Sequence, residues 1–418
     1  MHTEGGHHMK RHRHPLNNPN CTLWEAICDM DNLKLAHENA KKGKGWYKEV
    51  IMVDSNPEYY LNLLQEMLID KTYRTSEYEM FIKKDSGKER TIYKLPYFPD
   101  RICQWAIMQV IEPILINNFT KDTYSAIPGR GVHPIVKQLR GYHKKINKNE
   151  HVYVPSIFMN DPQGTQYTLK LDVQKYYPSI DHEILKSKYR RLFKDKDLLW
   201  LLDEIIDSAS TIEDISDIIL LEEDVDEVGI PIGNYLSQYS GNLYLSSFDH
   251  WIKEVKGVKY YFRYMDDVTI FGKSKEELHQ LKKEIEEYFT NKLNLTIKHD
   301  WQVFPTFIRG VDFVGYRFFF NYTLLRKSTC KNFKRKMLNL IKKTSSGKEL
   351  NYSEWCSINS YKGWLKWCDS YRLSEKYITP IQPYADDYYE TKIKTKGGKK
   401  DGQSWNGKKH CKTKRTCG

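Results

Sequence analysis

The chain has 418 residues, of which 40% are hydrophobic and 13% aromatic, so it can bury a substantial core and form two or three domains. Lysine and arginine outnumber aspartate and glutamate by 66 to 54, the pI is about 9.0 and the mean hydropathy is −0.68. No stretch is apolar for long enough to cross a bilayer, which excludes a membrane-spanning protein. The first residues lack the apolar core of a secretory signal, so we expect a cytoplasmic, reducing environment.

The cysteines and the charge distribution indicate the state of the thiols and a possible class of partner. The eight cysteines form no CxxC pair and no group with histidines at zinc-ligand spacing, which predicts free thiols. Residues 195–227 hold thirteen acidic residues and one lysine, so the rest of the chain is strongly basic. Basic surfaces bind nucleic acids because lysine and arginine release the counterions of phosphates. The charge alone is equally compatible with a protein that is merely soluble.

The first third of the chain is predicted to be mostly helical with one hairpin. Residues 1–20 are polar and His-rich and are expected to be a disordered tail, whereas residues 22–70 have the apolar spacing of two or three helices. Residues 77–95 contain two β-rich runs around an Asp-Ser-Gly turn, which predicts a basic hairpin. Residues 99–118 have helical apolar spacing, and the loop IPGRGVHP precedes another helix.

Two later segments carry clustered acids. YTLKLDVQKYYPSID begins as a strand at residue 167 and breaks at Pro178 before a helical run, which places Asp172 near a strand end. Residues 257–274 contain two β-rich runs that meet at Met265 and Asp266, a pattern typical of a tight hairpin. The turn of this hairpin therefore carries adjacent carboxylates.

The remaining segments are predicted from their periodicity and composition. A charged helix is expected from 274 to 290, a second hairpin at GVDFVGYRFFF, and helices rich in Lys, Trp and Tyr from 330 to 380. After residue 391 the chain has ten basic residues and one acid, which predicts a mobile arm that binds polyanions.

The paired acids point to a metal centre. Adjacent carboxylates between apolar strands raise each other's pKa unless a cation compensates. If the strand ending at Asp172 delivers its carboxylate beside Asp266 and Asp267, the three offer the hard oxygen ligands that Mg²⁺ prefers. Two such ions roughly 3.5 to 4 Å apart would activate a 3′-hydroxyl and stabilise a leaving pyrophosphate. A solvated Asp-Asp turn is the alternative, but the flanking aromatic strands favour a turn embedded in a sheet.

These motifs together resemble those of a known family. RYMDDV and LDVQKYYPSID resemble motifs C and A of the reverse transcriptases, and GIPIGNYLSQYSGNLYL at 229–245 resembles motif B. The basic hairpin and DRICQ resemble the finger motifs, and GVDFVGYRFF resembles the primer grip. The likeness extends from about residue 30 to 380 and lies within the bacterial group that includes group II intron enzymes.

The resemblance implies an α+β fold, the right-hand polymerase with fingers, an antiparallel palm sheet and a helical thumb. The N-terminal helices and fingers are predicted over 21–165, and the palm over 166–325 with an acidic insertion at 195–227. The thumb is predicted over 326–385 and a basic tail over 386–418.

The resemblance also assigns catalytic roles. Asp172, Asp266 and Asp267 match the catalytic acids, which with Val173 would hold two Mg²⁺ ions, or Mn²⁺ in their place. Tyr177 matches the aromatic gate that leaves no room for a ribonucleotide 2′-hydroxyl, although an ordinary core tyrosine is the alternative.

Three basic residues match positions that contact the incoming dNTP. Arg90 and Arg101 match finger residues that hold the triphosphate, a role suited to bidentate guanidinium binding, with plain surface charge as the alternative. Lys298 matches the motif D lysine that protonates the pyrophosphate.

Motif B departs from the common pattern. Most reverse transcriptases read QGxxxSP, whereas here Ile232 replaces Gln before Gly233, and Gln238 replaces Pro. The IGxxxSQ form resembles the reverse transcriptases of diversity-generating retroelements, which copy a template RNA into mutated cDNA that replaces part of a target gene. In the family the replaced Gln contacts the incoming nucleotide, and isoleucine offers no hydrogen bond, so selection of the correct nucleotide should weaken. The resemblance implies errors opposite template adenines, a base preference that no residue chemistry here explains.

The partners implied are a template RNA, a primer or cDNA, dNTPs and a basic accessory protein assembled as a ring. The acidic stretch is a candidate contact for that protein, and a solvated helix pair is the alternative. The implied location is a bacterial cytoplasm, with a bacterial or phage gene. The alternatives are an antiphage-defence, retron or group II intron-type enzyme, or a non-catalytic RNA-binding module. The three acids argue against the last.

Overall fold

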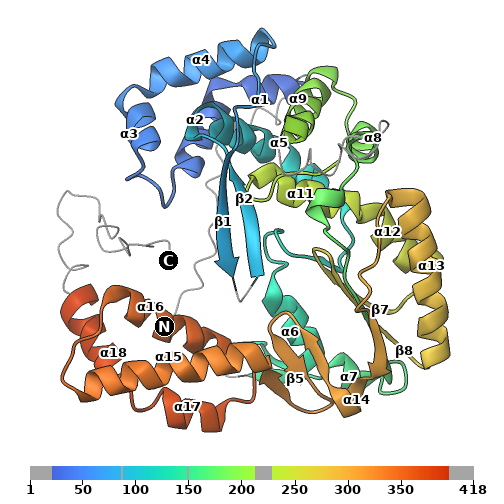
Figure 1. The fold of residues 1–418 in the computed structure, drawn as a ribbon, viewed down its shortest axis with the longest axis vertical. Helices are drawn as coiled ribbons and strands as arrows, with labels where there is room; N and C mark the ends of the chain where they lie inside the picture. Colours follow the sequence, from blue (N-terminus) through green and yellow to red (C-terminus); the bar gives the residue numbers. More distant parts are fainter. Residues whose placement is uncertain (1–20, 86–87, 148–149, 212–227, 395–418) are drawn as a thin grey trace. The chain divides into compact units, whose positions relative to one another are not determined.

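The computed structural model describes residues 21–85, 88–147, 150–211 and 228–394 (Figure 1). Helices and largely antiparallel sheets alternate along them, which confirms the expected α+β class. No helix among these residues is long and apolar enough to span a bilayer. The six cysteines that they contain are all free thiols. The expected tail at 1–20 and most of the basic tail lie outside the described residues.

The described residues divide into two compact units. Unit 1 comprises 21–130, 170–268 and 280–301, and unit 2 comprises 131–169, 269–279 and 302–394. The units cut across the predicted finger, palm and thumb boundaries, which stay predictions.

The first part of unit 1 is a helical cluster around one buried helix. Its core is α5 (Ile102–Asn118), which is apolar on nearly every face and contacts three other helices, as a helix without a polar face must. Residues 22–70 form four helices, where two or three were predicted, and the predicted helix at 99–118 is confirmed. The cluster contains α1 (Leu23–Cys28), α2 (Met30–Ala40), α3 (Lys48–Ser55), α4 (Pro57–Ile69) and the helical turn η2 (Tyr97–Arg101).

The predicted basic hairpin is present in unit 1. Strands β1 (Glu79–Asp85) and β2 (Lys88–Lys94) pair antiparallel, with Lys83 opposite Arg90 in the register. Figure 1 shows them as two long arrows joined at one end. Residues 86–87 at the turn are outside the described residues.

A five-stranded sheet has the order β3-β7-β8-β6-β9. Its strands are β3 (Thr123–Tyr124), β6 (Tyr167–Leu171), β7 (Tyr260–Tyr264), β8 (Asp267–Gly272) and β9 (Gln302–Pro305). The two residues between β7 and β8 form the predicted tight hairpin. Because β6 lies directly beside β8, the end of β6 is brought next to this turn.

The other helices around this sheet lie between its strands in the sequence, either between β6 and β7 or between β8 and β9. The predicted helix at 274–290 is α13 (Lys275–Leu293), and Phe289 on it packs edge-on against Phe248 at 4.7 Å. The remaining elements are η3 (Tyr177–Ser179), α8 (His182–Leu192), α9 (Lys196–Asp207), η4 (Ser208–Thr211), α11 (Tyr235–Tyr244), α12 (Ser246–His250) and η5 (Trp251–Val255).

The described part of the acidic stretch is helical, and its acids bond within unit 1. Asp203 pairs with Arg190 at 2.7 Å, and Asp207 pairs with Lys186 at 2.6 Å. Asp197 pairs with Lys71 at 2.5 Å. These acids therefore stabilise the fold, and the more acidic segment 212–227 is outside the described residues.

Unit 2 contains a small antiparallel sheet and the C-terminal helices. The predicted hairpin at GVDFVGYRFFF is confirmed as β10 (Val311–Phe313) and β11 (Tyr316–Phe318), to which β12 (Thr323–Leu325) adds a third strand. The predicted helices at 330–380 are α15 (Lys327–Ser345), α16 (Tyr352–Leu365), α17 (Tyr371–Tyr377) and α18 (Gln382–Tyr388), followed by η6 (Tyr389–Lys394). Its other elements are α6 (Val132–Arg140), β4 (Tyr142–Lys145), β5 (His151–Val154), α7 (Ile157–Asn160) and α14 (Thr306–Arg309).

Candidate active site

The turn between β7 and β8 presents Asp266 at its apex. Met265, the first turn residue, has φ +57°, in the left-handed region that two-residue hairpin turns require. This conformation costs an ordinary residue about 1–2 kcal/mol, so the surrounding structure must hold it. Asp267 then begins β8, and both carboxylates are half-buried.

Asp172 follows β6 and is held through its backbone. Its carbonyl accepts a hydrogen bond from the Lys298 amide at 2.9 Å, and Val173 forms an isolated antiparallel bridge with Ile297. These contacts extend the strand direction past its last residue. They fix the path of the chain where the metal-binding acid was predicted.

The electrostatics show that Asp172 and Asp266 lie together. Burial raises the pKa of Asp266 to about 7, and the charge of Asp172 adds to the effect, as does a hydrogen bond between the two carboxyl groups. The charge of Asp267 raises this pKa further. Such a pair resists carrying two negative charges, and a bound cation would relieve the repulsion.

Two lysines lie beside these acids. Lys170 Nζ is 3.2 Å from Asp267 Oδ2, and Lys298 Nζ is 3.7 Å from Asp172 Oδ2. A hydrogen bond from Lys298 to Asp300 raises the pKa of the lysine, so it is protonated at neutral pH. Lys298 is thus near the site, as the motif predicted. Lys170 was not predicted, although its position two residues before Asp172 in a strand places both on one face.

The three carboxylates are not equivalent. Within the described residues, no three His, Cys, Asp or Glu side chains are arranged as a ready metal site. Asp172 and Asp266 are the closely coupled pair, while Asp267 faces Lys170. The burial of Asp266 and its repulsion by Asp172, whose side chain is 38% exposed, fit a divalent cation bound by these two acids.

Tyr177 packs beside this pair. It begins η3, and burial together with the charge of Asp266 raises its pKa. A Cβ placed on Gly241 of α11 would lie 3.6 Å from the Tyr177 ring and hydroxyl. Tyr176 is buried beneath, and its hydroxyl donates to the Gly241 carbonyl at 2.5 Å. The ring of Tyr177 therefore lies against α11 and near Asp266 of the β7–β8 turn.

The motif B loop is fastened to the β1–β2 hairpin. The Tyr93 amide donates to the Ile232 carbonyl at 3.1 Å. Gly233 has φ +131°, and a Cβ there would stand 2.7 Å from the Tyr93 carbonyl oxygen, so only glycine fits. Helix α11 starts two residues later and exposes Gln238 on its surface.

A pocket of about 170 Å³ lies beside this junction. Its lining includes Arg101 and Gln104 from the start of α5, and Gly233 from motif B. Gln104 Oε1 accepts from the Tyr235 amide at 3.1 Å, which fixes the orientation of the side-chain amide. Gln104 Nε2 and Arg101 Nε are buried without a hydrogen-bond partner among the described residues. The pocket therefore offers donors to a ligand acceptor.

The pocket is also electrically positive. Burial and the nearby charges of Arg101 and Lys94 lower the pKa of Lys44 to about 8. Burial also lowers the pKa of Arg101. Arg90 lies on β2, but its side chain is outside the described part, so its predicted role stays a prediction.

Comparison with known proteins places this geometry in a family. The family model for reverse transcriptase (RNA-dependent DNA polymerase) matches residues 82–318, more than half of the chain. Protein YkfC of Escherichia coli K12 is 22% identical over 292 residues, which span 62% of this chain and 70% of that protein.

Two further proteins are more distant. The group II intron-encoded protein LtrA of Lactococcus lactis subsp. cremoris is 20% identical over 238 residues, which span 56% of this chain and 35% of LtrA. The structure of an apo telomerase from Candida tropicalis aligns with a TM-score of 0.42 at 13% identity, over 63% of this chain and 60% of that one. From the family match, this chain belongs to the reverse transcriptases, the RNA-dependent DNA polymerases.

Proposed function

We propose that this reverse transcriptase makes error-prone cDNA from a template RNA in a diversity-generating retroelement, with errors concentrated opposite template adenines. The observation that carries the proposal is Ile232 in motif B, at the position where most reverse transcriptases have glutamine. An aliphatic side chain can pack against the incoming nucleotide but cannot hydrogen-bond to it. Discrimination by hydrogen bonds is the stronger kind, so its loss weakens selection.

The backbone around Ile232 supports this reading. Its carbonyl is bonded to Tyr93, and Gly233 is in close contact with the same residue. The backbone that carries the side chain of residue 232 is therefore held in place by these contacts. Replacing the usual glutamine amide by the isoleucine side chain removes hydrogen-bonding groups and leaves the backbone contacts of residue 232 unchanged.

The catalytic acids would hold the divalent metal. Asp172 and Asp266 would bind it with help from the Val173 carbonyl and Asp267. Bound there, two Mg²⁺ ions, or Mn²⁺, would activate the primer 3′-hydroxyl and neutralise the charge of the leaving pyrophosphate. Tyr177 excludes the ribose 2′-hydroxyl, and protonated Lys298 donates a proton to the pyrophosphate.

The donors near motif B would bind the nucleotide. Arg101 Nε has no hydrogen-bond partner among the described residues, and Arg101 lines a pocket that is also lined by Gln104. A guanidinium there can bind two oxygens of a triphosphate at once. Arg90, on the neighbouring hairpin, and Gln238 complete the set that we propose contacts the dNTP.

The implied partners are the template RNA, the primer or cDNA strand and a basic accessory protein oligomer. The acids of α9 are already paired within unit 1. An accessory protein would therefore rely on the acidic residues 212–227. The likeness to LtrA favours a second candidate, a group II intron-type enzyme that copies accurately.

Primer extension on a defined RNA, followed by sequencing of the cDNA, tests the proposal. The wild-type chain should misincorporate mainly opposite adenine, and Ile232→Gln should reduce those errors about tenfold. Ile232→Val, which keeps an aliphatic side chain, is the matched control and should retain them. Asp266→Ala should yield no cDNA. Accurate copying by the wild type would overturn the retroelement assignment and favour the intron-type enzyme.

A further inference from the structure

Arg263 and Asp249 form an ion pair whose side chains are fully buried. Arg263 Nε donates to Asp249 Oδ1 at 2.7 Å, and Nη2 donates to Oδ2 at 2.5 Å, a two-pronged contact. Arg263 is on β7, two residues before the turn residue Met265, and Asp249 is on α12. A buried charge is costly unless every polar atom around it is bonded, so the rest of the guanidinium must also be accounted for.

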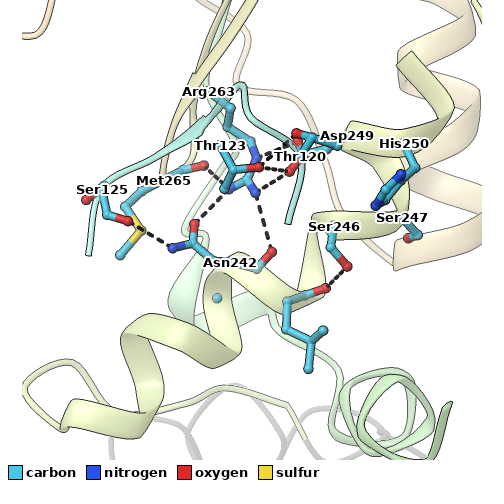
Figure 2. A network of polar contacts seen from close by, with 12 residues as sticks. Thr120, Thr123, Ser125, Asn242, Ser246, Ser247, Asp249, His250, Arg263 and Met265 are labelled. Atoms are coloured by element: carbon cyan, nitrogen blue, oxygen red, sulfur yellow. Dashed lines mark hydrogen bonds and ion pairs between the residues drawn. The ribbon is translucent and has the colours of Figure 1, made fainter. Parts of the chain in front are cut away.

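Every guanidinium N–H of Arg263 has an acceptor, as Figure 2 shows. Nη1 donates to Asn242 Oδ1 at 3.1 Å and to the Met265 carbonyl at 2.9 Å, and Nη2 also reaches the Asn242 carbonyl at 3.4 Å. Asp249 is equally saturated, since its oxygens also accept from the Tyr261 hydroxyl at 2.5 Å and Thr123 Oγ1 at 2.7 Å. The network uses all five donors of the arginine.

The network reaches both motif B and the catalytic turn. Asn242 is on α11, and its Nδ2 donates to the Ser125 carbonyl at 3.0 Å. Met265 is held at φ +57°, with its carbonyl on Arg263, and the next residue is Asp266. One buried guanidinium thus joins the motif B helix, the loop after β3 and the turn that carries the catalytic acid.

We propose that Arg263 is a positioning residue, which holds the strained turn at Met265 so that Asp266 is presented to Asp172, and which ties that turn to helix α11 through Asn242. The proposal rests on the proposed catalytic role of Asp266. Lysine cannot replace the arginine, because its single nitrogen cannot serve the Asp249 carboxylate and the Met265 carbonyl with the same planar geometry.

The test must separate positioning from stability. Arg263→Met alone would leave Asp249 buried and unpaired, so the informative variant is Arg263→Met combined with Asp249→Asn, which removes both charges and keeps an acceptor for Tyr261. Tyr261→Phe is the matched control, since it takes one hydrogen bond from the same carboxylate and leaves the bond to Met265 intact. Arg263→Lys gives a third, independent variant.

Three measurements on the full chain test whether Arg263 positions the turn. Amide hydrogen exchange over residues 264–268 should be at least ~10-fold faster in the double variant, and Mn²⁺ binding should be ~10-fold weaker per folded molecule. In primer extension its kcat should fall at least ~10-fold with the KM for primer–template unchanged. Arg263→Lys should shift in the same direction, and Tyr261→Phe should lower only the melting temperature.

Turn exchange and Mn²⁺ affinity equal to wild type in the folded double variant would overturn the proposal. A wild-type chain without Asp266-dependent synthesis would instead overturn the proposed function. Hydrogen exchange would still decide whether Arg263 holds the turn, because it does not depend on polymerisation.

Discussion

Lys170 on β6 faces Asp267 on β8, with Nζ 3.2 Å from Oδ2. The two residues belong to neighbouring strands of the five-stranded sheet, and both are partly exposed. The pair lies beside the coupled carboxyl groups of Asp172 and Asp266. A fixed cation in this position competes electrostatically with a divalent ion for the same negative charge.

Removing that cation should strengthen metal binding. We expect Lys170→Gln to lower the Mg²⁺ concentration for half-maximal primer extension by about 2- to 5-fold, because the site gains one net negative charge in a partly screened environment. Lys292→Gln, which removes an exposed lysine from α13, is the control and should leave the titration unchanged. A higher half-maximal Mg²⁺ concentration in Lys170→Gln would contradict this prediction and would mean that the lysine orients Asp267.

Gly233 should not tolerate a side chain. Gly233→Ala would place a Cβ 2.7 Å from the Tyr93 carbonyl oxygen, at a φ of +131°. Because this contact is too close, the motif B loop would have to move away from the β1–β2 hairpin. The cost should be on the order of 2–4 kcal/mol, read by urea unfolding. Gly45→Ala is the matched control, because a Cβ there meets nothing within 4 Å. Equal unfolding midpoints for the two variants would contradict the strain at Gly233.

Tyr177 should control sugar selection. Tyr177→Ala removes the ring packed at Gly241 and should raise the ratio of kcat/KM for rNTPs over dNTPs by about 10- to 100-fold, since a steric barrier to the 2′-hydroxyl is lost. Tyr176→Phe keeps both rings and loses only the hydrogen bond to the Gly241 carbonyl. It should therefore cost about 1 kcal/mol of stability and leave the ratio unchanged. An unchanged ratio in Tyr177→Ala would make Tyr177 an ordinary packing residue.

Most local elements, and the placement of Asp172 beside Asp266, were predictable because their signals are local. The β7–β8 hairpin follows from two β-rich runs that meet at Met265 and Asp266. Strand β6 ends at Leu171, before Pro178, so the proline did not mark the strand end. The pairing of Lys170 with Asp267 was not predictable. Lys170 meets Asp267 only because β6 lies beside β8, and strand order cannot be read from periodicity.

Other features were hidden for different reasons. The hairpin of β4 and β5 was missed because most of its residues are exposed, so the sequence lacks the apolar–polar alternation of a half-buried strand. The buried Arg263 network was missed because an arginine in a strand signals exposure, and only the fold shows that Asp249 and Asn242 surround it. The motif indicated Gly233, while the contact with Tyr93 supplies the physical reason for it.

The raised pKa of Asp266 predicts a characteristic pH dependence of stability in the metal-free protein. In the unfolded chain this carboxyl titrates near 3.8, and in the folded chain near 7, so the folded state binds the proton more tightly. Its contribution to stability is full below about pH 4 and is lost as the pH rises to about 7. The loss should be on the order of 2 kcal/mol, discounted because Asp266 is only half-buried. Thermal unfolding in EDTA from pH 5 to 8 should show this decline, and Asp266→Asn should flatten it.

Mn²⁺ should restore stability at pH 8 and have little effect at pH 5, where a proton is bound to the carboxyl pair. A metal-free stability that rises across this window in the wild type and falls in Asp266→Asn would show that Asp266 is ionised without a cation, and that Lys170 or Lys298 already compensates its charge.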